Sequence, residues 1–226
     1  MTAHTAIGLF GGTFDPVHFG HLRAASEAKE KLGLNDFRLL PVGEPAHRDL
    51  THASAEHRLA MLRLAVAEHP DIAVDNREVR RSGVSYMVDT LAEVRREAGT
   101  ETAILLILGQ DAAHGLCGWH RWQELFDYAH LVVMTRPDSP ASFPAQLESF
   151  VTTRRRNAMA DLWQSPAGLL LNLEVTQLAI SSTAIRMRIA QKRSPRFLLP
   201  DRLLGYIDSH QLYGQLHSQL SSQIDK

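Results

Sequence analysis

The sequence has only one cysteine, Cys117, so the chain cannot form an internal disulfide or a cluster of thiolate metal ligands. It also lacks a long apolar run: the longest covers seven residues, 103–109. A membrane-crossing helix needs roughly 18–20 residues. The chain also has no excess of charge of one sign, because it contains 24 lysines and arginines and 25 aspartates and glutamates, and the formal net charge is −1. These absences argue against a membrane or a nucleic acid as partner, so any phosphate must be bound by a local site.

The length and composition fit one folded domain. Residues 1–10 contain no basic leader, long apolar stretch or small-residue cleavage site, so we expect a cytoplasmic protein. The 226 residues are 44% hydrophobic and 22% charged, which is ordinary for a globular chain. We expect a single domain over residues 1–214 and a polar tail at 215–226. Within the domain, the proline-containing stretch 136–168 is expected to be an insertion or a helical excursion, and 181–214 a C-terminal helical part.

Short apolar runs alternate with segments in which apolar residues recur every three or four positions. The runs expected to be strands are 7–10, 37–42, 104–108, 131–134 and 169–175. The segments expected to be helical are 22–32, 59–66, 88–94, 182–191 and 201–210. This order predicts an α/β fold that is Rossmann-like and doubly wound, with a mainly parallel sheet, helices on both faces and a small C-terminal helical part. In such folds ligands bind beyond the carboxyl ends of the strands.

The loop after the first predicted strand has the features of a phosphate site. Gly11 and Gly12 allow a tight turn and the close approach of a ligand to backbone N–H groups. A helix that begins near Gly20 would point its free amides and positive dipole end into the same space. His18 and His21 could offer two imidazole N–H donors to an anion.

Spacing alone leaves an ordinary turn and a chance pair of surface histidines open as alternatives. A zinc site is disfavoured, because the loop lacks both the glutamate of a His-Glu-x-x-His motif and nearby acidic ligands. A nicotinamide redox cofactor is disfavoured too, because the glycine pattern of dinucleotide-binding loops is missing.

The stretch 11–21 as a whole resembles the signature of the nucleotidyltransferases that carry a His-x-Gly-His motif. In that superfamily a nucleoside triphosphate binds between this motif and a second one late in the chain. Residues 180–186, Ile-Ser-Ser-Thr-Ala-Ile-Arg, resemble the second motif. A serine at a helix start caps free amides, and Arg186 lies one turn further on. Alone, this pattern would indicate only a capped helix with a solvent-facing arginine; the pair of motifs favours a nucleotide site.

Four further stretches resemble one branch of the superfamily, the bacterial nicotinate-nucleotide adenylyltransferases, and the likeness runs from about residue 7 to 213. They are Pro45-Ala46-His47-Arg48, Ser85-Tyr86-Met87, Ile107-Leu108-Gly109-Gln110-Asp111 and Trp119. In the family the tryptophan stacks on the pyridine ring, and backbone amides bind the nicotinate carboxylate. The likeness assigns these roles to Trp119 and to the amides of Met87 and His120. A packed core aromatic is the alternative for Trp119, although Gly118 and the polar residues after it favour a half-exposed position.

The resemblance implies three sets of site residues. The catalytic set is His18, His21 and Arg186. The ATP-binding set is Gly11, Gly12, Thr13, Phe14, His18, His21, Gly109, Asp111, Ile180, Ser181, Ser182 and Arg186. The set for the second substrate is His47, Arg48, Ser85, Tyr86, Met87, Asp111, Trp119 and His120. No protein metal ligands are expected, and Mg²⁺ would be held chiefly by the phosphates of ATP.

The implied reaction joins ATP and nicotinate mononucleotide to give deamido-NAD and pyrophosphate, a step of NAD biosynthesis. The 5′-phosphate of the mononucleotide attacks the α-phosphorus of ATP in line, with no covalent enzyme intermediate. The alternatives are nicotinamide mononucleotide or another phosphorylated acceptor, or a sensor that binds both nucleotides without turnover. The sequence leaves open whether the protein is a monomer or a homo-oligomer.

Overall fold

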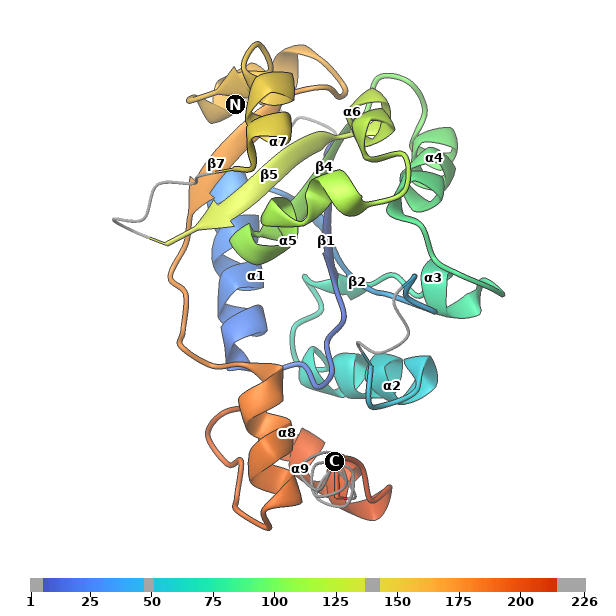
Figure 1. Cartoon of the computed structure of the whole chain (residues 1–226), viewed down its shortest axis with the longest axis vertical. Helices are drawn as coiled ribbons and strands as arrows, with labels where there is room; N and C mark the ends of the chain where they lie inside the picture. The colour runs from blue at the N-terminus through green and yellow to red at the C-terminus, as the bar shows by residue number, and fades with distance from the viewer. Residues whose placement is uncertain (1–5, 47–50, 137–142, 215–226) are drawn as a thin grey trace, which may run out of the picture.

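The computed structural model describes residues 6–46, 51–136 and 143–214 (Figure 1). Within them the centre is a sheet of seven strands, all paired in parallel, in the order β3-β2-β1-β4-β5-β7-β6. The strands are β1 Ala6–Gly12, β2 Asp36–Pro41, β3 Ala73–Val74, β4 Ala103–Gly109, β5 His130–Thr135, β6 Arg155–Arg156 and β7 Leu170–Glu174. The strand order reverses between β1 and β4, so the predicted Rossmann-like, doubly wound fold is confirmed.

All five predicted strands are present, and the two strands that the sequence analysis missed lie at the edges of the sheet. β3 and β6 contain two residues each, which is too short to leave an apolar run in the sequence. β6 consists of two arginines of a basic run and pairs with β7. Part of the stretch 136–168 therefore belongs to the sheet itself.

Apolar side chains leave β4 alternately toward the two faces of the sheet. Leu105 and Ile107 pack in the cluster that contains the buried alanines of α1. Leu106 and Leu108 pack on the other face, in the cluster that contains the buried residues of α4. Because both faces are covered, an uninterrupted apolar strand is stable at the centre of the sheet.

The predicted helices are also present. The helices are α1 Phe19–Leu32, α2 Ala55–Ala65, α3 Arg77–Arg80, α4 Met87–Ala98, α5 Gln110–His114, α6 Leu125–Tyr128, α7 Ala145–Val151, α8 Ser182–Ala190 and α9 Asp201–Ser209. Ser54 caps α2, since its Oγ accepts the N–H of His57, and Ser181 caps α8 by accepting the N–H of Ala184. The sequence analysis missed α3, α5 and α6, which have four or five residues and so show little periodicity, whereas α7 lies in the stretch 136–168, where an insertion or a helical excursion was expected.

Helices α8 and α9 lie together at one end of the molecule, beyond the sheet (Figure 1). Two hydrogen bonds tie this part to the start of α1: Ser182 Oγ donates to Pro16 O, and Phe19 N donates to Leu198 O. The C-terminal helical part therefore lies against the loop that follows β1. In the described part of the chain, no helix combines the length and apolar character needed to cross a membrane.

Candidate active site

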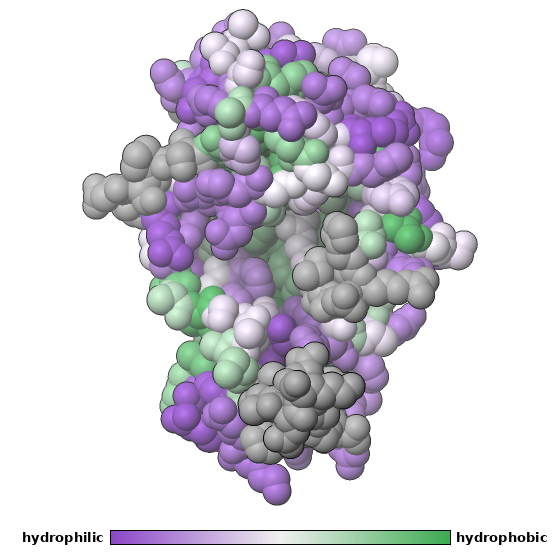
Figure 2. All heavy atoms as spheres, viewed as in Figure 1, coloured by the Kyte–Doolittle hydropathy of each residue, from purple (hydrophilic) through white to green (hydrophobic). Residues whose placement is uncertain are grey.

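Two cavities open at the carboxyl ends of β1 and β4, where the strand order reverses. We call the first the Trp119 pocket and the second the His21 pocket, after a residue that lines each. Gly11, Gly12 and Ala112 line both cavities, so the two adjoin at the end of β1. Figure 2 shows the surface hollowed near the middle of the face that Figure 1 presents.

The His21 pocket contains the two histidines of the first motif. Their rings stack with a centroid separation of 3.8 Å, and the Nδ1 atoms of both are buried without a hydrogen-bond partner in the described structure. Gly20 lies between them, and a Cβ there would lie 3.0 Å from the His18 ring, which would have to shift slightly, and at an ordinary contact distance of 3.5 Å from Ile180 O. The glycine of the motif thus leaves room for the ring of the first histidine.

Both histidines have strongly depressed pKa values. Burial lowers the pKa of His18 from 6.5 to about 4. Burial, with a smaller repulsion from His18, lowers the pKa of His21 to about 3. In the free protein at neutral pH both rings are therefore neutral, and each has one N–H to donate. An anion in the pocket would favour the protonated rings.

The second motif lies against the first, although about 160 residues separate them. Ser181 and Ser182 line the His21 pocket at the start of α8, as does Ile180 before them. Arg186 Nη1 donates to the backbone oxygen of Asp15 at 2.6 Å, and Nη2 donates to Thr183 Oγ1 at 3.2 Å. The guanidinium is held beside the β1–α1 loop and is not among the residues that line either pocket.

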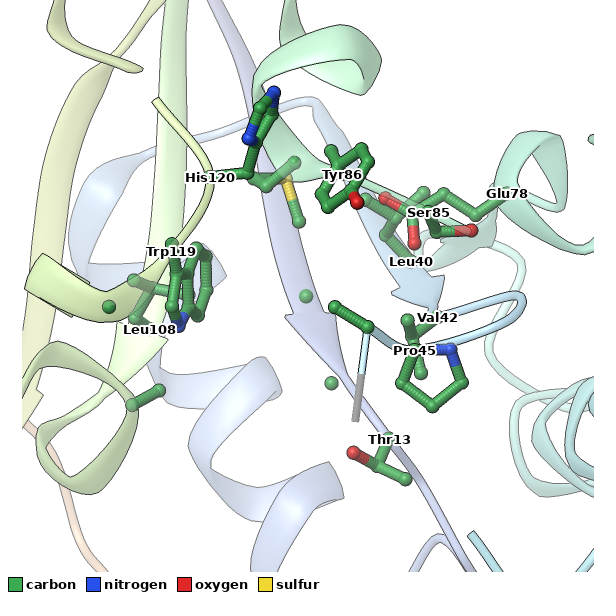
Figure 3. A pocket seen from close by; sticks show the side chains of 16 residues that line it. Thr13, Leu40, Val42, Pro45, Glu78, Ser85, Tyr86, Leu108, Trp119 and His120 are labelled. Carbon is green, nitrogen blue, oxygen red and sulfur yellow. The ribbon is translucent and has the colours of Figure 1, made fainter. Parts of the chain in front are cut away.

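The Trp119 pocket contains the predicted pyridine-binding residues (Figure 3). Ser85, Tyr86, Met87, Trp119 and His120 all line it. Figure 3 shows the indole of Trp119 on one side of the cavity. The rings of Tyr86 and His120 pack together with centroids 4.4 Å apart. The indole is half-buried against the core and also lines the cavity, so part of its surface faces the cavity.

The remaining predicted residues divide between several places. Gly109 and Asp111, two of the residues expected to bind ATP, line the His21 pocket. Thr13 lines the Trp119 pocket instead. Phe14 lines neither, because its side chain is 1% exposed and packs edge-on against His21. The other two members of the substrate-binding set, His47 and Arg48, lie outside the described residues.

The structure adds a buried polar network to which the sequence analysis gave no role. The carboxylate of Asp15 accepts hydrogen bonds from His52 N, Ala53 N and the hydroxyl of Tyr213. Burial and the neighbouring carboxylate raise the pKa of Tyr213 far above its usual value. Arg58, also fully buried, donates to three backbone carbonyls. Arg58 was detectable, since it falls on the apolar face of α2, whereas nothing in the sequence marked Tyr213.

The described residues contain no group of three or more histidine, cysteine, aspartate or glutamate side chains placed to hold a metal ion. Asp111 is the one carboxylate among the described residues that line the His21 pocket. The pocket wall therefore offers one carboxylate as a possible metal ligand, and such a site is compatible with Mg²⁺ held mainly by phosphate oxygens and water.

The fold and this pair of pockets define the class of α/β nucleotidyltransferases, and the comparisons agree. The family model described as cytidylyltransferase-like matches residues 9–188. The chain is 47% identical over 210 residues to a protein of Dechloromonas aromatica named as a probable nicotinate-nucleotide adenylyltransferase, covering 92% of this chain and 97% of that one. A protein of the same name from Hahella chejuensis is 44% identical over 219 residues, covering 96% and 100%. The chain belongs to the nicotinate-nucleotide adenylyltransferase family, as the motifs predicted.

The fold also has a close structural counterpart among solved structures. The nicotinic acid mononucleotide adenylyltransferase of Plasmodium falciparum, solved in complex with NaAD, superposes with a TM-score of 0.69. Its sequence is 14% identical to this chain, and the superposition covers 93% of this chain and 98% of that one. At this identity the likeness supports the fold alone.

Proposed function

We propose that the protein transfers the adenylyl group of ATP to nicotinate mononucleotide, with deamido-NAD and pyrophosphate as products. One observation carries the proposal: the His21 pocket and the Trp119 pocket meet at Gly11 and Gly12. A nucleoside triphosphate in the first and a pyridine mononucleotide in the second would bring two phosphates together at the bare backbone of these glycines. Reaction between two bound phosphates requires this adjacency.

The chemistry requires positioning and charge stabilisation and no protein nucleophile. The 5′-phosphate of the mononucleotide is already ionised near neutral pH, so it attacks the α-phosphorus without a general base, and pyrophosphate leaves. The new P–O bond joins the two nucleotides as the bond between the α-phosphorus and the bridging oxygen breaks. His18 and His21 would donate hydrogen bonds to the α-phosphate as its charge redistributes.

The N-terminus of α8 would bind the remaining phosphates. Ser181 and Ser182 line the His21 pocket at the start of α8, where the positive end of the helix dipole lies. Arg186 lies one turn further along; its guanidinium, bonded to Asp15 O and outside the pocket lining, would supply a permanent positive charge to the triphosphate from beside the β1–α1 loop. Asp111 would accept a hydrogen bond from a ribose hydroxyl. Mg²⁺, bound by the phosphates, would supply additional charge neutralisation.

Recognition of the pyridine ring would fall to Trp119 and to backbone amides. The indole would stack on the ring, and the amides of Met87 and His120 would bind its carboxylate. A backbone contact tolerates methionine in place of threonine at position 87. The same amides could also meet a carboxamide, so preference for the acid over nicotinamide mononucleotide is a separate question. We also propose a cytoplasmic location with small-molecule partners alone.

The test is a pyrophosphate-release assay with purified protein, ATP, Mg²⁺ and one acceptor at a time. We expect release with nicotinate mononucleotide, and the ratio of kcat/KM values with nicotinamide mononucleotide measures the preference for the acid. If pyrophosphate is released only with phosphopantetheine, nicotinate mononucleotide is not the acceptor and this part of the proposal is wrong. Tight calorimetric binding of both nucleotides without any pyrophosphate would favour a sensor and overturn the proposed reaction.

A further inference from the structure

Arg58 is a cation held in the interior of the protein. It lies on α2 and its residue is 1% exposed. Its Nε donates to Ala53 O at 3.3 Å, Nη1 donates to Thr13 O at 2.9 Å, and Nη2 donates to Gly43 O at 2.8 Å. All three acceptors are neutral carbonyls of the backbone. A planar guanidinium can satisfy three separated acceptors at once, which the single nitrogen of a lysine cannot do in the same geometry.

The three carbonyls belong to three segments near the Trp119 pocket. Thr13 itself lines the pocket, next to the shared glycines. Gly43 follows Val42 and precedes Pro45, both of which line the pocket. Ala53 lies just before α2, and its N–H is bound by the buried carboxylate of Asp15. Arg58 thus connects Thr13 in the β1–α1 loop to Gly43, which follows β2, and to Ala53, which precedes α2.

The backbone at Val42 and Gly43 is also confined by α3 and by β1. A Cβ on Gly43 would lie 2.1 Å from Glu78 O, so the backbone of α3 touches the glycine directly. Val42 N donates to Gly12 O at 3.1 Å. The close approach of α3 and the hydrogen bond from Arg58 together restrict the backbone at position 43.

We propose that Arg58 is a positioning residue for the acceptor mononucleotide. By holding Thr13 and Gly43 at a fixed separation, it sets the place of Pro45 and Ala46 in the wall of the Trp119 pocket. Its effect is selective, because none of the three acceptor residues lines the His21 pocket. The inference rests on the proposed function, since it assigns the Trp119 pocket to the mononucleotide.

The chain provides a matched control in Arg95. Its guanidinium also donates to backbone carbonyls, among them Thr102 O at 2.6 Å, Tyr128 O at 2.7 Å and Pro166 O at 2.9 Å. These acceptors lie before the amino ends of β4, β5 and β7, at the opposite end of the strands from both pockets. A loss of guanidinium–carbonyl bonds at Arg95 should affect folding without changing a pocket wall.

The experiment compares Arg58→Lys and Arg58→Gln with Arg95→Lys and Arg95→Gln by steady-state kinetics and by calorimetric binding of nicotinate mononucleotide. For the Arg58 variants we expect KM and Kd for the mononucleotide to rise about tenfold as the pocket wall shifts, with the lysine variant less affected because it keeps the positive charge. The KM for ATP should change less than about threefold, a small change in free energy. The Arg95 variants should keep both KM values.

Equal effects of the Arg58 and Arg95 variants on the two KM values would overturn the inference, because Arg58 would then only stabilise the fold. The same conclusion follows if both Arg58 variants fail to fold while the Arg95 variants fold. A wild-type protein that binds the mononucleotide but releases no pyrophosphate would instead contradict the proposed function. Calorimetry on the variants would still test Arg58 in that case.

Discussion

The imidazole rings of His18 and His21 stack with centroids 3.8 Å apart and an angle of 27° between their planes. Two protonated rings at this distance would repel each other, and burial disfavours even one positive charge. The free protein therefore keeps a neutral pair of donors in the His21 pocket. Polyanion binding would compensate the cost of protonating them, so nucleotide binding and proton binding are linked.

Binding of ATP should take up protons below neutral pH. The pKa values of His18 and His21 are about 4 and about 3 in the free protein, and a triphosphate bound in the His21 pocket would raise both. Near pH 6 the free rings are neutral, so any protonated ring in the complex has gained its proton on binding. Titration calorimetry in buffers of different ionisation enthalpy measures this uptake. If the binding enthalpy of ATP does not depend on the buffer in either the wild type or His21→Asn, protonation of these histidines is not linked to ATP binding and the prediction is wrong.

The free energy of unfolding should fall as the pH is lowered below 6.5. In the unfolded chain both histidines regain pKa values near 6.5, so between pH 6.5 and about 4 the unfolded state binds more protons than the folded state. The contribution of the two rings is thus present above pH 6.5 and is lost as the pH falls. Urea unfolding at a series of pH values should give a shallower slope for His18→Asn. His69→Asn, at an exposed position, is the control and should keep the wild-type slope.

His21→Ala should lower kcat at saturating substrates by about 100–1000-fold, the usual cost of removing a donor that acts in the transition state. The Kd values for ATP and the mononucleotide should change much less, because several other groups hold each ground state. Pre-steady-state measurement of pyrophosphate release with calorimetric Kd values separates the two effects. An unchanged kcat would remove His21 from the mechanism.

Trp119→Ala should raise the KM for nicotinate mononucleotide by about tenfold to a hundredfold, because stacking of a base on an aromatic ring contributes about 1–3 kcal/mol. The KM for ATP should stay close to that of the wild type. Phe197→Ala removes an aromatic ring that is 82% exposed and lines neither pocket, so it is the control. If the ATP constant alone moved in Trp119→Ala, the division of the two pockets would be wrong.

Tyr213→Phe should destabilise the protein by about 1.5–3 kcal/mol, the range for a hydrogen bond to a charged group. The hydroxyl donates to the buried carboxylate of Asp15 at 2.7 Å, and its loss leaves that carboxylate with fewer donors. Tyr206→Phe removes a hydroxyl that pairs at 2.9 Å with His57, which is only partly buried, and should cost less. Unfolding of the wild type and the two variants in guanidinium chloride measures both losses of stability. Equal losses in the two variants would show that burial of the Tyr213–Asp15 hydrogen bond adds nothing to the free energy of unfolding.

Much of the fold could be predicted from the apolar pattern. The strands β1, β2, β4, β5 and β7 were visible because a strand buried on both faces must be apolar throughout. The edge strands β3 and β6 were not visible, because two residues paired on one side need no such pattern. The buried hydrogen bonds of Arg58 could also have been predicted, because an arginine on the apolar face of a helix needs buried acceptors for its guanidinium.

The sequence by itself determined the family, the parallel α/β fold and the two motifs, because these depend on residue types at fixed local spacing. Only the tertiary structure decided which distant segments meet. It brought the start of α8 against the loop after β1, placed Thr13 in the Trp119 pocket, buried Phe14 and paired Tyr213 with Asp15. These contacts join residues far apart in the chain, and nothing in the local pattern of either partner records the other.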